Sequence, residues 1–317
     1  LSERAVLYTE MVAAEAVIQG DRDRLLKVDA LEQPLAVQLG GSEPRKMAEA
    51  ARICAEHGFV EINMNVGCPS DRVQSGTFGA CLMENPTRVA QCVAAMRTAV
   101  PEAVSITVKC RIGVDDQDPE VALPALADAV WNAGCNGIWV HARKAWLQGL
   151  SPKENRDVPP LDYAIVRQLK VDNPSRFVGL NGGLDSIEMC QEAVENLDAV
   201  MVGRAAYHTP DMLRLVDNVL YKTPIERAVH LTDAEHFWLQ SDHVVNAMCE
   251  YADRHVKDGG RLHHVTRHIV GLFHCMKGAR RWRRALSEET RDNAASGHVL
   301  KQAFERLRDL NQGDMAA

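Results

Sequence analysis

The sequence has no apolar run long enough to span a membrane, and no charged and then apolar leader precedes its first predicted strand. We therefore expect a soluble, cytoplasmic protein with no membrane partner. Nothing in the sequence indicates an obligatory protein partner. With 317 residues, the chain is long enough for one large α/β domain and a smaller appended domain.

Paired cysteines are absent too. The nine cysteines are an odd number and are scattered without metal-type spacing, which argues against a disulfide framework and a zinc site. The acidic cluster at residues 115–118 lacks the spacing of a calcium loop, so we interpret it as a solvated loop and expect no metal. Cys81 is an intermediate case and Cys68 differs from the rest. The remaining seven lie in apolar surroundings and are expected to be buried: Cys54, Cys92, Cys110, Cys135, Cys190, Cys249 and Cys275.

Short apolar, β-branched runs alternate with helical stretches, which is typical of parallel strands joined by crossover helices. Apolar residues at helical spacing predict helices over Pro44–Gly58 and Pro86–Val100. Polar residues or glycines recur at the strand ends, and in a (β/α)8 barrel these ends meet at one mouth. We therefore predict an α/β fold of the (β/α)8, or TIM-barrel, class. The predicted strands are Ala5–Met11, Leu35–Gly40, Val60–Val66, Ser105–Ile112, Gly137–His141, Phe177–Leu180 and Ala199–Val202.

Seven strands are countable, whereas a closed barrel of this class needs eight, and the chain begins at Leu1. We expect that the first strand of the barrel is absent from this sequence. After about Tyr221 the strand rhythm stops, and helical patterning continues to the end. The sequence thus predicts a barrel domain over residues 1–221 and a helical domain over residues 222–317.

Charge is spread unevenly along the chain. The net charge is −7, which by itself would discourage a nucleic-acid partner. One segment between residues 254 and 284 nevertheless has nine basic residues and a single acid, Asp258, so the remainder is more acidic than the average. This asymmetry indicates a basic tail domain on an acidic body. The basic residues are Arg254, Lys257, Arg261, Arg267, Lys277, Arg280, Arg281, Arg283 and Arg284.

The segment Glu61–Ser70 places an amide and a thiol at the end of a predicted strand. Gly67 and Pro69 stop the strand abruptly on either side of Cys68. A tight turn with many backbone donors is a poor place to bury a hydrophobe, so we interpret Cys68 as a group for chemistry. Asn65 can pair with an imide edge through a donor and an acceptor at once. The alternative is an asparagine that merely closes a turn.

Several long motifs, in matching order, resemble those of the tRNA-dihydrouridine synthases. They are Val66–Gln74 (VGCPSDRVQ), Phe78–Ala80 (FGA), Val108–Gly113 (VKCRIG) and His141–Trp146 (HARKAW). Ser151–Arg156 (SPKENR) and Asn181–Gly183 (NGG) resemble the A subfamily, which reduces uridines 20 and 20a in the D-loop of tRNA. The similarity runs from Leu7 to about Leu286. The family also has a first strand with an Ala-Pro-Met end that contacts the flavin, and no segment here corresponds to it.

The resemblance implies reduction of the uracil C5–C6 double bond with FMN, which NADPH recharges. Side chains cannot supply a hydride, so a cofactor must supply it, and the family assigns the proton for C5 to Cys68. Gln38, Lys109 and His141 resemble the family's flavin-ring and ribityl contacts. Lys109 would stabilise the anionic reduced flavin. Taken alone, Lys109 would be an ordinary ion-paired lysine and His141 a hydrogen-bonded rim histidine.

The flavin phosphate is expected at the ends of the last two strands, the usual phosphate corner of such barrels. Glycines there expose backbone N–H groups, and an arginine adds positive charge. Taken singly, a Gly-Gly pair is only a turn signal. The residues at these two strand ends are Asn181, Gly182, Gly183, Gly203 and Arg204.

A uridine in folded tRNA must swing out of the RNA to reach a deep pocket, so the enzyme must hold the surrounding backbone. The resemblance assigns the target uracil to Asn65 and tRNA contacts to Lys153, Arg156, Arg280 and Arg283. The alternative for these charges is a solvated face. Trp282 could stack on a base or anchor its helix to the barrel, and we favour core anchoring.

Two other functions stay open. The first is a flavin oxidoreductase of a small molecule, because a fold does not fix its substrate, although the basic segment argues against it. The second is a tRNA-binding protein without catalysis, which the missing first strand would permit. Flavin absorption of the purified chain would distinguish an enzyme from a pure binder.

Overall fold

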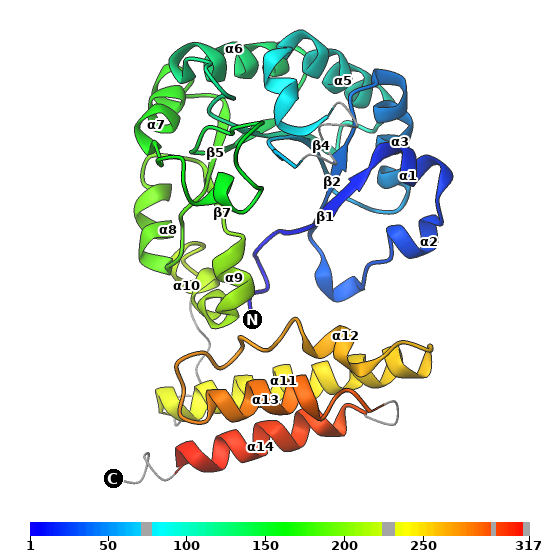
Figure 1. Ribbon diagram of the computed structural model, residues 1–317, viewed down its shortest axis with the longest axis vertical. Coiled ribbons are helices and arrows are strands. Elements are labelled where there is room, and N and C mark those ends of the chain that lie inside the picture. Colours follow the sequence, from blue (N-terminus) through cyan, green and yellow to red (C-terminus); the bar gives the residue numbers. More distant parts are fainter. Residues whose placement is uncertain (71–77, 224–231, 293–295, 313–317) are drawn as a thin grey trace. The chain divides into compact units, whose positions relative to one another are not determined.

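The computed structural model describes residues 1–70, 78–223, 232–292 and 296–312. Residues 71–74 of the motif at the end of the third strand lie outside these ranges. Contacts between residues divide the chain into two compact units. Figure 1 shows the chain coloured from blue at the N-terminus to red at the C-terminus. The barrel unit comprises Arg4–Leu184 and Glu188–Val202. The helical unit comprises Leu1–Glu3, Asp185–Ile187 and Gly203–Ala317.

The barrel unit contains one parallel sheet of seven strands that pair in chain order. The predicted TIM-barrel class is thereby confirmed, and all seven predicted strands are present with small shifts at their ends. In the described part of the chain, β1 and β7 are the edges of the sheet. The strands are β1 Leu7–Ala13, β2 Leu35–Gly40, β3 Glu61–Val66, β4 Ser105–Arg111, β5 Gly137–His141, β6 Phe177–Asn181 and β7 Ala199–Met201.

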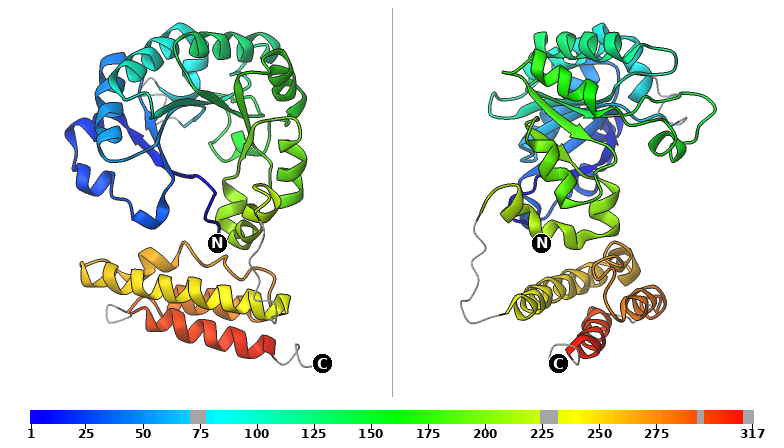
Figure 2. Two further views of the ribbon diagram at one scale, coloured as in Figure 1. Left: turned by 180° about the vertical axis from the view of Figure 1, so that it is seen from behind. Right: turned by 90° about the vertical axis from the view of Figure 1, so that its left-hand side faces the viewer.

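Ten helical segments are described around these strands, and α3, α5, α6, α7 and α8 follow the outer face of the curved sheet (Figures 1 and 2). The two helices predicted from the sequence correspond to α3 and α5. The segments are α1 Ala14–Gln19, α2 Arg22–Leu25, η1 Ala30–Glu32, α3 Pro44–Glu56, η2 Gly79–Glu84, α5 Pro86–Ala99, α6 Pro119–Asn132, η3 Glu154–Arg156, α7 Tyr163–Asp172 and α8 Ile187–Val194.

The two faces of the sheet differ in chemistry, because successive side chains of a strand point to opposite sides. On the outer face, Ile62 and Met64 of β3 and Val108 of β4 are fully buried. On the inner face, the intervening positions are polar, as with Asn63 and Lys109. Bulky branched side chains usually fill the inside of such barrels. Here β3 and β4 instead place polar side chains on the inner face, where they are available for chemistry.

The acidic cluster at residues 115–118 has structural roles that differ from the solvated loop predicted above. An oxygen of Asp118 accepts from the backbone N–H of Glu120 at 3.0 Å and caps α6. Asp115 accepts from the backbone N–H of Leu147 at 2.8 Å. Two of these carboxylates thus satisfy backbone donors, and Asp116 is exposed.

The helical unit has its own apolar core. Trp282 is only 1% exposed, its Nε1 donates to the carbonyl of Ile269 at 3.2 Å, and its ring packs on Phe273. Trp282 thus lies in the core of the helical unit, and its anchoring to the barrel stays a prediction. Within the described ranges, no helix has the length and hydropathy needed to cross a bilayer. The segments are α9 Arg204–His208, η4 Pro210–Leu215, α10 Val216–Val219, α11 Asp233–Lys257, α12 Leu262–Thr266, α13 Ala279–Glu288 and α14 His298–Gln312.

Replacing Trp282 with alanine should destabilise the helical unit by about 3–5 kcal/mol, because it empties a large buried site and removes a hydrogen-bond donor from Ile269. Urea unfolding followed by circular dichroism measures the change. Arg281→Ala on the exposed face of α13 is the matched control and should change stability little. Equal stability of the two variants would contradict the core role.

Candidate active site at the carboxyl ends of the strands

Cys68 lies two residues beyond the end of β3, in a turn that Asn65 holds. The side-chain oxygen of Asn65 accepts from the backbone N–H groups of Gly67 at 3.1 Å and Cys68 at 3.0 Å. The carbonyl of Cys68 accepts from the N–H of Ala80 at 2.9 Å, at the start of η2. The thiol is half-buried. The turn thus fixes the backbone under a sulfur that solvent can reach.

These bonds revise the role predicted for Asn65. Its oxygen uses both lone pairs on the turn, while its nitrogen donates to Gln38 Oε1 at 2.7 Å. Asn65 therefore closes a turn, which was the alternative, and in this geometry it cannot offer both an acceptor and a donor to an imide. One N–H remains for a ligand. Gln38 in turn donates to Asn63 Oδ1 at 2.8 Å, which also leaves it one N–H.

Lys109 is on β4, beside Asn65 in the sheet register, and projects from the inner face. Burial lowers the pKa of its ammonium group to about 8, and the neighbouring Arg111 contributes to the shift. Among the residues that the structure describes, no hydrogen bond or ion pair to this ammonium is found. A cation in such a place favours an anionic or electron-rich ligand, because that ligand would offset the cost of its burial.

Arg111, two residues further along β4, was not among the predicted site residues. Its side chain is buried and donates to three carbonyl oxygens: Asn155 at 2.8 Å, Gly67 at 3.2 Å and Lys144 at 3.3 Å. It thereby ties the Cys68 turn to the loop after β5. Burial lowers its pKa to about 10. The alternation of β4, which places Arg111 on the same face as Lys109, was the signal in the sequence.

His141 ends β5 and is buried between Arg111 of β4 and Asn181 of β6 in the register of the sheet. Its ring lies against Gly182, where a Cβ atom would come within 3.1 Å of Nε2. Gly182 also has a φ of 106°, so this position favours glycine for both space and backbone conformation. The sequence therefore brings Gln38, Cys68, Lys109 and His141 to the carboxyl ends of consecutive strands, as predicted.

The residues predicted to bind phosphate fall into two groups. Asn181 donates to the carbonyl of Met201 at 2.7 Å and so joins β6 to β7. Gly183 is exposed and has a φ of 70°. Gly203 and Arg204 belong to the helical unit, where Gly203 is the N-cap of α9 and both residues are exposed. A joint phosphate site formed by these groups stays a prediction.

The predicted tRNA contacts are all exposed. Lys153 is the N-cap of η3 and Arg156 is its last residue. Between them, Asn155 is fully buried and holds the loop by accepting from Trp146 N–H at 2.7 Å and donating to Trp146 O at 2.9 Å. Sequence reasoning missed Asn155, because its bonds within the loop depend on the folded chain. Arg280 and Arg283 lie on the exposed face of α13 in the helical unit.

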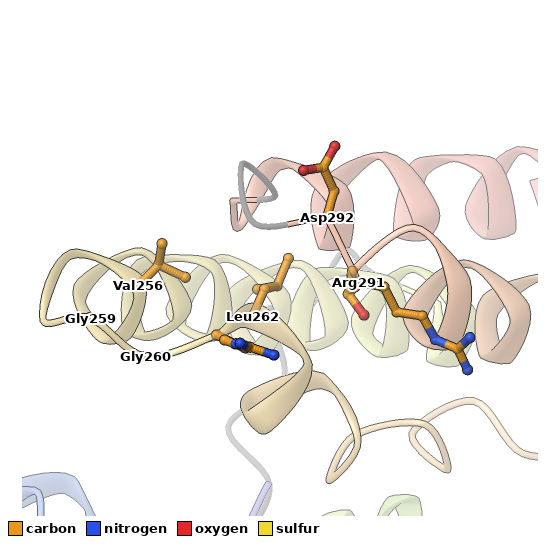
Figure 3. Close-up of a pocket in the computed structure, with 8 residues that line it drawn as sticks. Val256, Gly259, Gly260, Leu262, Arg291 and Asp292 are labelled. Carbon is orange, nitrogen blue, oxygen red and sulfur yellow. The ribbon is translucent and has the colours of Figure 1, made fainter.

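A pocket of about 240 Å³ is present in the helical unit, near the end of α11 and the start of α12 (Figure 3). It contains none of the residues predicted to bind flavin, uracil or tRNA. Its lining consists of Val256, Gly259, Gly260, Arg261, Leu262, Thr290, Arg291 and Asp292.

A parallel α/β barrel that presents a thiol, amides and buried cations at the carboxyl ends of its strands has the architecture of a barrel enzyme. The dihydrouridine synthase (Dus) family profile matches residues 1–308, and the chain belongs to this family. Proteins called tRNA-dihydrouridine(20/20a) synthase are similar along almost their whole length. The protein of Shewanella oneidensis is 49% identical, over 97% of this chain and 88% of its own. That of Salmonella typhimurium is 47% identical, over 98% and 89%. That of Vibrio cholerae is 44% identical, over 97% and 90%.

Lys109→Met should stabilise the ligand-free protein at pH 7, by on the order of 3 kcal/mol. The folded-state pKa lies below the usual 10.5, so the charged form is disfavoured by folding. This cost is fully present below about pH 8 and disappears as the pH rises towards 10.5. Thermal melting at pH 7 and pH 10.5 tests both points.

Lys153→Met removes the same charge from an exposed loop and is the control, with no expected gain in melting temperature. A Lys109→Met protein that melts below the wild type at pH 7 would show that the buried ammonium is satisfied by the fold.

Proposed function

We propose that this chain reduces uridine to 5,6-dihydrouridine in the D-loop of tRNA, at positions 20 and 20a, the positions in the names of its relatives. The observation that carries the proposal is the Cys68 turn, which Asn65 and Arg111 hold next to Lys109 in a chain of the dihydrouridine synthase family. A thiol held at the strand ends can give its proton to the ring carbon that becomes electron-rich when a hydride adds to the other carbon of the double bond.

The chain's own residues fit a flavin. Lys109 supplies a cation in the interior, and Gln38 has one N–H left after its bond to Asn63. We propose that these two residues and His141 hold the ring and ribityl chain of FMN. For its phosphate we propose Asn181, Gly182, Gly183, Gly203 and Arg204. When bound, FMN supplies the hydride for C6 of the uracil, and NADPH restores its reducing power.

Cys68 provides the other half of the reduction. Its thiol gives a proton to C5 as C6 gains the hydride, so that one double bond becomes two C–H bonds and a thiolate remains. This thiolate would lie near the positive charges of Lys109 and Arg111. A proton from solvent then restores the thiol, which the half-buried position of Cys68 permits.

For the RNA, we propose that Lys153 and Arg156 contact its backbone from the loop after β5, and that Arg280 and Arg283 do so from α13. Residues 1–221 would then form the FMN-binding catalytic domain and residues 222–317 the tRNA-binding helical domain. Since the proposed substrate is tRNA, we propose a cytoplasmic location and no obligatory protein partner.

Cys68→Ala should retain FMN and its reduction by NADPH but lose most formation of dihydrouridine, because only the proton donor is removed. Stopped-flow absorbance measures the first step and mass spectrometry of tRNA nucleosides the second. Cys275→Ala is the control and should match the wild type in both, because Cys275 is exposed and not buried as predicted. Turnover by Cys68→Ala at the wild-type rate would refute the role of Cys68.

Neutralising Arg280 and Arg283 together should weaken tRNA binding and reduce the slope of log affinity against log salt by about one per lost phosphate contact. Oxidation of NADPH without tRNA should not change. Lys46→Ala with Arg52→Ala removes the same charge from exposed positions of α3 and should leave the slope unaltered. If both double variants have the same salt slope, Arg280 and Arg283 belong to a solvated face and do not contact the tRNA.

A further inference from the structure

A row of polar side chains crosses the inner face of the sheet from β1 to β4. Glu61, Asn63 and Asn65 are alternate residues of β3, so they project from the same face. In the register, Asn63 lies between Gln38 of β2 and Thr107 of β4. Asn63 is fully buried, and Thr107 and Asn65 are nearly so. Buried polar groups must therefore satisfy one another here.

The row is one continuous chain of hydrogen bonds. The hydroxyls of Tyr8 and Thr107 both donate to Glu61 Oε1. Asn63 then donates to Thr107 Oγ1 at 2.8 Å, Gln38 donates to Asn63 at 2.8 Å, and Asn65 donates to Gln38 at 2.7 Å. The chain ends where the backbone N–H groups of Gly67 and Cys68 donate to Asn65.

The direction of this chain follows from Glu61. A carboxylate only accepts hydrogen bonds, and the single proton of the Thr107 hydroxyl is used on it. Thr107 can therefore only accept from Asn63, which turns the amide NH₂ of Asn63 towards Thr107 and its oxygen towards Gln38. Gln38 must then direct its NH₂ towards Asn63 and its oxygen towards Asn65, and Asn65 must direct its NH₂ towards Gln38. Without the carboxylate, only the backbone donors of Gly67 and Cys68 would set the direction, from the Asn65 end, and the Thr107 hydroxyl would be free to donate to Asn63.

The other groups around Glu61 support this direction. Burial and the charge of Glu61 raise the pKa of Tyr8, so that its hydroxyl remains a donor at every ordinary pH. The ring of Tyr8 is also held edge-on to Trp139 at 6.2 Å. At the end of the row away from Cys68, Glu61 thus only accepts hydrogen bonds. At the Cys68 end, the oxygen of Asn65 only accepts hydrogen bonds from backbone N–H groups.

We infer that Glu61 is a positioning residue, which acts through Thr107, Asn63 and Gln38 to fix Asn65 as a hydrogen-bond donor towards a carbonyl oxygen of the substrate base. This inference rests on the proposed function for the identity of the base. The oxygen of Asn65 is occupied by the turn, so its remaining N–H is the group that a ligand can meet. A uracil carbonyl accepts such a bond, whereas the ring N3–H does not.

Thr107→Val tests the inference, because it removes the link between Glu61 and Asn63 with little change in volume, and Thr107→Ser is the matched control that keeps the hydroxyl. The first measurement is the position of the side-chain amide resonances of Gln38 and Asn65 in ¹⁵N-labelled holoenzyme. We expect both to shift in Thr107→Val and to stay near wild type in Thr107→Ser. Unshifted resonances in Thr107→Val would overturn the inference.

The second measurement is activity. Dihydrouridine formation should fall at least tenfold in Thr107→Val and recover in Thr107→Ser. Equal losses in both variants would show a packing effect and overturn the inference. If Thr107→Val does not fold, Glu61→Met is tested in its place, because this variant removes the acceptor at the Tyr8 end of the row. The side-chain amide resonances of Gln38 and Asn65 should shift in Glu61→Met as well. A wild type that forms no dihydrouridine would refute the proposed function, yet the resonances would still decide the direction of the row.

Discussion

The alternation of side chains along parallel strands is the constraint on which this active site depends. Each strand between Leu35 and Leu180 must bury one face under helices, and that face is uniformly apolar. The other face is then free to carry polar groups, but these must be satisfied within the sheet because little water reaches them. The row from Glu61 to Asn65 meets that requirement, and in doing so it fixes the turn that holds Cys68.

Two cations complete the arrangement in different ways. Arg111 donates hydrogen bonds to backbone carbonyl oxygens and so links the Cys68 turn to the loop that carries Lys153 and Arg156. Lys109 has no such partner among the described residues, and its lowered pKa records the cost of its burial. One cation is thus structural and the other is available to a ligand. A fold that keeps such a lysine is less stable than it could be, which is common where stability is exchanged for activity.

Much of this could be predicted from the sequence. The seven strands, the strand-end positions of Cys68 and Lys109 and the buried Trp282 follow from local apolar patterns and turn residues. The roles of Arg111 and Asn155 could not be predicted, because they depend on partners that are far away in the sequence or on loop geometry. The orientation of the Asn65 side-chain amide could not be predicted either, because it depends on hydrogen bonds among residues of four strands.

The central claim is that the thiol at the end of β3 serves the reduction of uridine in the D-loop. The most direct measurement maps dihydrouridine in tRNA from cells in which the chromosomal gene is deleted. These cells are compared without a plasmid copy, with a plasmid copy of the wild-type gene, and with a plasmid copy of the Cys68→Ala variant. The account predicts dihydrouridine at positions 20 and 20a with the wild type alone, and unchanged dihydrouridine elsewhere. Normal levels at both positions in cells with the variant, or in cells without any copy, would contradict it.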